Sequence, residues 1–172
     1  MFHTTLVVTH IVGAVGALIT GFWALNAPNG TPRHRRLGKT YLLMWALLAG
    51  AGLIIGLGRP GITIFEVLNV LGFGTVAMAY RAVLLRKRIG HAWLQKHYKW
   101  MVNSLAFLVI ATINQVLPRM GIEYPIWVFL LMVASPSLII PFYVRRLDRR
   151  YGFVEPRAVR TTKKEHTAPG EA

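Results

Sequence analysis

The feature of this sequence that most limits its fold is a series of five apolar runs, each long enough to cross a lipid bilayer. The hydrocarbon core of a bilayer is about 30 Å thick, and a helix rises about 1.5 Å per residue, so roughly 20 apolar residues span it. Charged residues make up only 15% of the chain, whereas soluble domains carry about 25%. We therefore expect an all-α integral membrane bundle with five transmembrane helices. The predicted spans are residues 4–27, 37–57, 62–85, 98–117 and 126–144.

Short polar segments separate these runs, and the chain ends in a basic tail. The sequence Pro28-Asn29-Gly30, which follows the first run, is a strong turn signal. Pro136 and Pro141 lie inside the fifth run, and packed membrane helices tolerate the bends that such prolines cause. We expect residues 1–147 to form the membrane domain. Residues 148–172 are polar and rich in charge, which predicts a mostly disordered tail.

The distribution of Lys and Arg predicts how the bundle is oriented. In a five-span protein, the segments after the first and third spans lie on the same side as the C-terminal tail. All Lys and Arg residues lie in or beside those three segments, except Arg59 and Arg119. The positive-inside rule therefore places the N-terminus outside and the C-terminus in the cytoplasm, as in a bacterial inner membrane. Because the basic residues flank helix ends, we expect lipid around the chain and no nucleic-acid partner.

The composition also limits the chemistry that the chain can perform. It contains no cysteine, which excludes disulfides, thiolate metal sites and c-type haem attachment. No glycine-rich phosphate loop and no catalytic motif typical of soluble enzymes is present. The candidate functional groups are therefore the polar side chains in or beside the spans, because such groups are costly in a bilayer.

Three histidines lie near the cytoplasmic ends of the second and fourth spans: His34, His91 and His97. Two imidazoles from different helices at one depth are what the iron of haem b needs, and nearby Arg and Lys would neutralise the propionates. His34 and His97 match in depth, and His91 would replace His97 if the fourth helix began earlier. The alternative is that these histidines only anchor helix ends among the lipid headgroups.

A second set of polar side chains is expected in the outer half of the bundle. His10 lies about two turns into the first span, and small residues follow it at helical spacing, so a backbone or a flat cofactor could approach closely. His10 is also a candidate haem ligand, but most of a span separates it from His34, so the two cannot share one iron. The set indicates either an interhelical hydrogen-bond lock or a quinone or proton site. By depth, the converging side chains are His10, Glu66, Asn69, Asn114 and Gln115.

Two segments carry the patterns His-Arg-x-x-Gly-x-x-Tyr and His-x-x-Trp: His34-Arg-Arg-Leu-Gly-Lys-Thr-Tyr41 and His91-Ala-Trp-Leu-Gln-Lys-His-Tyr-Lys-Trp-Met101. With these segments the chain resembles a known family of bacterial membrane proteins, DUF2306. The resemblance extends from His10 to Leu117. Where we expect a basic residue near the far end of the fourth span, this chain has Asn114-Gln115. The resemblance implies a loose similarity to four-helix b-type cytochromes and ferric-reductase-like membrane domains, and no particular reaction.

These observations favour one function and leave a second one open. The first is a membrane protein that binds haem b and transfers electrons within the bilayer, with the four histidines named above as candidate ligands. The second is a non-catalytic accessory or assembly subunit of a larger, respiratory membrane complex, or a homo-oligomer, packed through its Gly and Ala faces. A small transporter is the third interpretation. It ranks last because one Glu and few other polar residues in the spans offer little for a substrate to bind along a path across the membrane.

Overall fold

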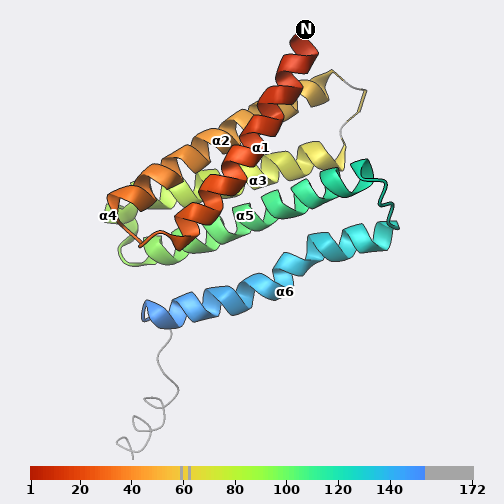
Figure 1. Ribbon diagram of the computed structural model, residues 1–172. Coiled ribbons are helices and arrows are strands. Elements are labelled where there is room, and N and C mark those ends of the chain that lie inside the picture. The colour runs from red at the N-terminus through yellow and green to blue at the C-terminus, as the bar shows by residue number, and fades with distance from the viewer. Residues whose placement is uncertain (59, 62, 154–172) are drawn as a thin grey trace, which may run out of the picture.

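The computed structural model describes residues 1–58, 60–61 and 63–153, and this part of the chain is helical and contains no strand (Figure 1). Arg59 and residues 154–172 of the expected tail lie outside the described residues. The helices are α1 (Phe2–Asn26), α2 (Pro32–Leu57), α3 (Ile64–Leu84), α4 (Arg86–Ile89), α5 (Ala92–Arg119) and α6 (Ile126–Arg150). All except α4 are long and apolar enough to cross a membrane. The expected all-α bundle with five membrane-spanning helices is therefore confirmed.

Several helices extend beyond the apolar runs. α2 begins at Pro32 rather than 37, α5 begins at Ala92 rather than 98, and α6 continues to Arg150. Hydropathy marks the part of a helix that lies in lipid, whereas capping decides where the helix begins. At α2 the hydroxyl of Thr31 accepts a hydrogen bond from the backbone N–H of His34 at 3.2 Å, and Pro32 occupies the first turn.

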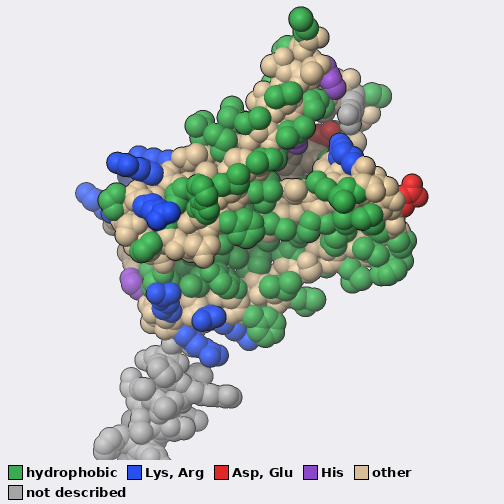
Figure 2. Space-filling model, in the orientation of Figure 1, with side chains coloured by type: hydrophobic (Ala, Val, Ile, Leu, Met, Phe, Trp, Pro, Cys, Tyr) green, Lys and Arg blue, Asp and Glu red, His purple; other side chains and the backbone are tan. Residues whose placement is uncertain are grey.

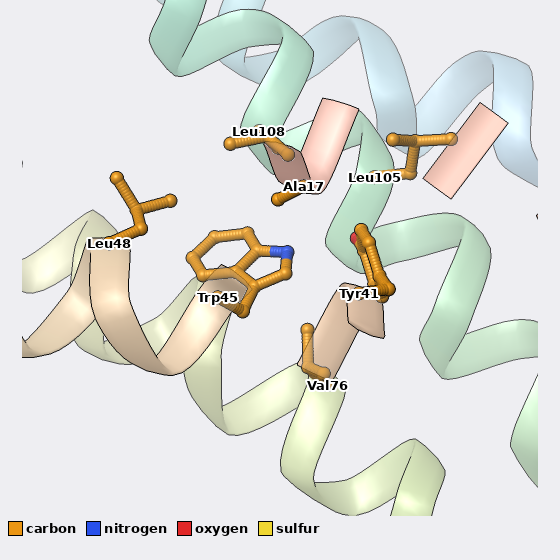
Figure 3. Packing of buried hydrophobic residues seen from close by; sticks show 7 residues of the cluster. All are labelled: Ala17, Tyr41, Trp45, Leu48, Val76, Leu105 and Leu108. Atoms are coloured by element: carbon orange, nitrogen blue, oxygen red, sulfur yellow. The ribbon is translucent and has the colours of Figure 1, made fainter. Parts of the chain in front are cut away.

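The main hydrophobic core lies where α1, α2, α3 and α5 meet. The backbones of α1 and α2 touch, because a Cβ placed on Gly13 would lie 2.7 Å from the nitrogen of Leu48. Around Gly13 the small face of α1 therefore packs directly against α2. The hydroxyl of buried Tyr41 pairs with Ser104 Oγ at 2.9 Å, which joins α2 to α5. The core side chains, shown in Figure 3, are Ala17, Tyr41, Trp45, Leu48, Val76, Leu105 and Leu108.

α6 stands apart from the other long helices. Of the described helices, only α5 packs closely along it, and Figure 1 shows α6 beside α5 and away from α1 and α2. A second small cluster, Tyr98, Ile140 and Val144, fills the space between α5 and α6. The α6 side that faces away from α5 is apolar and open.

The outer surface fits a bilayer. Large apolar side chains such as Phe22, Leu130 and Phe142 are exposed along the helices. Figure 2 shows that hydrophobic side chains cover most of this face, and that most Lys and Arg gather at the end of the bundle where α4 lies. We call this the basic end. That the basic end faces the cytoplasm stays a prediction from the charge pattern.

Candidate functional site

A cavity of about 480 Å³ opens at the basic end between α1, α2, α3, α5 and α6. We call it the histidine cavity, because His34 and His97 both line it. Its volume lies within the range of about 300–1,000 Å³ that is typical of ligand sites. Most of its surface is apolar, and its apolar lining includes Gly21, Leu25, Val76, Met101 and Leu105. Its basic lining residues are Arg35, Lys39, Arg86 and Arg150.

The two histidines of this cavity are held in the same way. Nδ1 of His34 lies 3.0 Å from the carbonyl oxygen of Ala24, and Nδ1 of His97 lies 3.1 Å from the carbonyl oxygen of Ala79. A carbonyl only accepts a hydrogen bond, so Nδ1 must carry the proton in each ring. Nε2 of the neutral ring then keeps its lone pair, which is the arrangement found in histidines that bind metals.

The separation of the two rings suits one shared metal ion. Their ring centres lie 6.4 Å apart, with an angle of 78° between the ring planes. Imidazole nitrogens bind metals at about 2.0–2.1 Å, so two rings on opposite sides of one metal have centres roughly 6 Å apart. The angle is no obstacle, because each ring can turn about its own metal–nitrogen bond.

His91 lies outside this arrangement, although α5 begins earlier than expected. Its ring stacks on Phe153, with 4.7 Å between the ring centres, and it does not line the histidine cavity. Trp93 instead lines the cavity, and its ring centre lies 6.2 Å from that of His97. His91 therefore contacts the segment after α6, and His34 and His97 form the pair.

At the other end of the bundle, His10 and Asn69 meet on either side of Gly52. Nδ1 of His10 lies 3.0 Å from the carbonyl oxygen of Leu48, and Nδ2 of Asn69 donates to the carbonyl oxygen of Ala49 at 3.0 Å. A Cβ placed on Gly52 would lie 3.0 Å from His10 Nδ1 and 2.8 Å from Asn69 Nδ2. These two polar side chains therefore lock α1 and α3 onto α2.

The other predicted members of the outer set serve helix ends. Glu66 forms a capping box at the start of α3, where its carboxylate accepts from the backbone N–H of Thr63 at 2.6 Å. Asn114 accepts from the hydroxyl of Tyr124 at 2.6 Å. Gln115 accepts from the side chain of Arg119 at 2.7 Å. The structure thus brings His10 and Asn69 together, whereas the other three side chains make separate contacts. Glu66 also lies against α2, where a Cβ placed on Gly56 would be 2.7 Å from its Oε1. In the described part of the chain, no three His, Asp or Glu side chains are grouped as a metal site.

The sequence profile of the family DUF2306, described as a predicted membrane protein, matches residues 7–144. This chain belongs to the DUF2306 family. The match confirms the resemblance seen in the sequence, and it includes both histidines of the cavity. No curated protein and no solved structure is significantly similar to the chain.

One buried polar contact of this DUF2306 protein was not predicted from the sequence. Asp148, at the C-terminal end of α6, is only 7% exposed. Its Oδ1 accepts from Gln95 Nε2 at 2.9 Å and from the hydroxyl of Tyr98. Tyr98 also lines the histidine cavity, so this contact fastens α6 to α5 beside the site. The sequence feature that could have predicted this contact is a single acidic residue within a run of arginines, at helical spacing from Val144 and Tyr151.

Proposed function

We propose that this DUF2306 protein is a b-type haem protein that passes electrons within the membrane, and that His34 and His97 would hold the haem iron. The single observation that carries the proposal is the matched pair of imidazoles. They come from α2 and α5, each has its Nδ1 on a backbone carbonyl, and their ring centres lie 6.4 Å apart in one cavity.

A haem fits these residues better than a bare metal ion. Structural zinc sites use about four protein ligands and catalytic ones about three, whereas the described residues offer two histidines and no third acidic or histidine ligand grouped with them. Haem brings its own ring nitrogens and asks the protein only for axial ligands. Two histidines are therefore a sufficient set for haem and an insufficient one for zinc.

The charge and polarity of the cavity also match a haem. The macrocycle is apolar and its two propionates are anionic. The lining is mostly apolar, and it carries basic side chains from three helices: Arg35 and Lys39 of α2, Arg86 of α4 and Arg150 of α6. Arginine and lysine hydrogen bonds to carboxylates are charge-assisted and therefore strong. These basic residues would hold the propionates of a haem, and the apolar residues of the lining, Val76 and Leu105 among them, would contact its macrocycle.

The parts played by the protein's own groups follow from this arrangement. When bound, haem b supplies a one-electron redox centre. The carbonyls of Ala24 and Ala79 orient the two imidazoles, and the basic residues offset the charge of the propionates. The apolar lining would limit the access of water to the bound group, and such a lining influences the redox potential.

We further propose that the protein resides in a bacterial inner membrane with its basic end in the cytoplasm and its N-terminus outside, because almost all Lys and Arg lie in or beside the segments after the first and third spans and in the C-terminal tail. Reporter fusions after Gly90 should then read cytoplasmic, and fusions after Gly121 should read external. The opposite pattern would contradict this orientation.

The absorption spectrum of the protein purified from haem-replete cells tests the function. After reduction, it should show the sharp α band of a b-type haem. A colourless preparation would contradict the proposal and favour the accessory-subunit function. The open, apolar side of α6, which exposes Leu138 at 71% and Phe142 at 73%, would then be the surface for a membrane partner or a second copy.

A further inference from the structure

The histidine cavity lies in a gap of the helix packing. α1 and α2 line one side of it, while Tyr143, Leu147 and Arg150 of α6 line another. Of the described helices, only α5 packs closely along α6, and Figure 1 shows the separation between α6 and the α1–α2 pair. The C-terminal half of α6 is therefore a wall of the cavity that is attached along one side.

Pro136 precedes this wall, and Pro141 lies near its start, before the cavity-lining Tyr143. Pro136 and Pro141 lie inside α6, and each lacks the N–H that would bond the carbonyl four residues earlier. The carbonyl released by Pro136 is that of Met132, and the hydroxyl of Ser135 donates to it at 2.8 Å. The helix ladder is thus already interrupted before Tyr143. A bend there costs fewer backbone hydrogen bonds than a bend elsewhere in the helix.

Apolar packing around Ile140 and Val144 holds the wall against α5, and polar contacts hold its far end. Buried Asp148 accepts from Gln95 and Tyr98, as described above. Just beyond α6, the hydroxyl of Tyr151 accepts from Nδ2 of Asn29 in the α1–α2 loop. We call the contacts of Asp148 with Gln95 and Tyr98 the α6 latch.

We propose that the ligand of the histidine cavity is loaded from the bilayer, through the gap between α6 and the α1–α2 pair. The C-terminal half of α6 swings about Pro136 and Pro141, and the α6 latch holds it closed. The cavity lining is mostly apolar, so its ligand is a molecule that partitions into lipid. That the cargo is haem b rests on the proposed function; the swinging wall does not.

A single thiol inside the cavity tests this route without haem. The natural chain has no cysteine, and Gly38 lines the cavity at a point where an added Cβ meets no atom within 4 Å. Gly38→Cys, reconstituted in liposomes, should react faster with a lipid-soluble N-alkyl maleimide than with a charged maleimide added in water. Gly50→Cys, on the exposed side of the same helix, serves as the matched thiol outside the cavity.

The latch is tested by Tyr98→Phe and Asp148→Asn in the Gly38→Cys background. Each should speed the reaction with the lipid-soluble reagent by roughly tenfold or more, because a hydrogen bond to a charged group contributes at least about that factor to an equilibrium. Glu123→Gln, an acidic residue in the loop before α6, should leave the rate unchanged. Tyr98→Phe keeps the ring, so it separates an open wall from an unfolded one.

Faster labelling by the charged reagent, or latch variants that leave the rate unchanged, would overturn the route. A colourless protein whose labelling follows the latch would remove haem as the cargo and leave the swinging wall intact. A protein that contains haem, but whose labelling rate is unchanged by the latch variants, would keep haem as the ligand and remove the swinging wall.

Discussion

Histidines at the two ends of the bundle make the same hydrogen bond, but only those at the basic end line a large cavity. At both ends, Nδ1 of a histidine bonds a backbone carbonyl of a neighbouring helix: His34 and His97 at the basic end, and His10 at the other. The difference is space. Along α2, a Cβ on Gly38 meets no atom within 4 Å, whereas a Cβ on Gly52 would press on His10 and Asn69. If the proposed function holds, the histidines of the basic end can bind a ligand because the packing there leaves room and two imidazoles line one cavity.

The variant that should break this contrast most clearly is Gly38→Phe. It places a large ring in the histidine cavity without a clash at its Cβ, so haem binding should be lost while the protein still folds. Haem content per protein and the thermal unfolding temperature measure the two effects separately. Gly50→Phe, on the open side of α2, should keep both the haem and the stability.

At the closed end, Gly52→Leu should reduce stability. Its side chain would collide with His10 and Asn69, and overpacking typically costs about 1–3 kcal/mol. Haem binding at the basic end should persist in the protein that folds. Thermal unfolding in detergent, compared with Gly50→Leu, checks this; equal melting temperatures would show that the outer end is not tightly packed.

A smaller effect is expected from Asn69→Leu, which removes one interhelical hydrogen bond to the carbonyl of Ala49. Such bonds in membrane proteins contribute about 0.6 kcal/mol on average. The melting temperature should therefore fall slightly, and haem content should not change. Loss of haem from this variant would mean that the outer pair belongs to the functional site.

The fold could be predicted from the sequence because a bilayer leaves few alternatives. An apolar run of bilayer length must form a helix that satisfies its own backbone, and five such runs give five membrane-spanning helices. Helix ends were harder to predict, since Thr31 and Pro32 start α2 in a segment that hydropathy reads as a loop. The gap beside α6 depends on how residues far apart in the sequence pack, so it could not be predicted from any single segment.

Depth along a helix could be estimated, but direction around it could not. His34 and His97 lie at one depth and also in one cavity. Asn114 and Gln115 are neighbours, so their side chains point about 100° apart on a helix of 3.6 residues per turn, and both cannot face one cluster. Asp148 was placed in a polar tail, because a single acid among arginines gives no sign of burial until α5 lies beside it.

The most direct test of the account compares the reduced absorption spectra and haem contents of three proteins purified side by side. These are the natural protein, His97→Ala and His10→Ala. The account predicts a b-type α band in the natural protein and in His10→Ala, and none in His97→Ala, although all three fold. An α band that survives His97→Ala, or that disappears with His10→Ala, would contradict the assignment of the haem to the basic end.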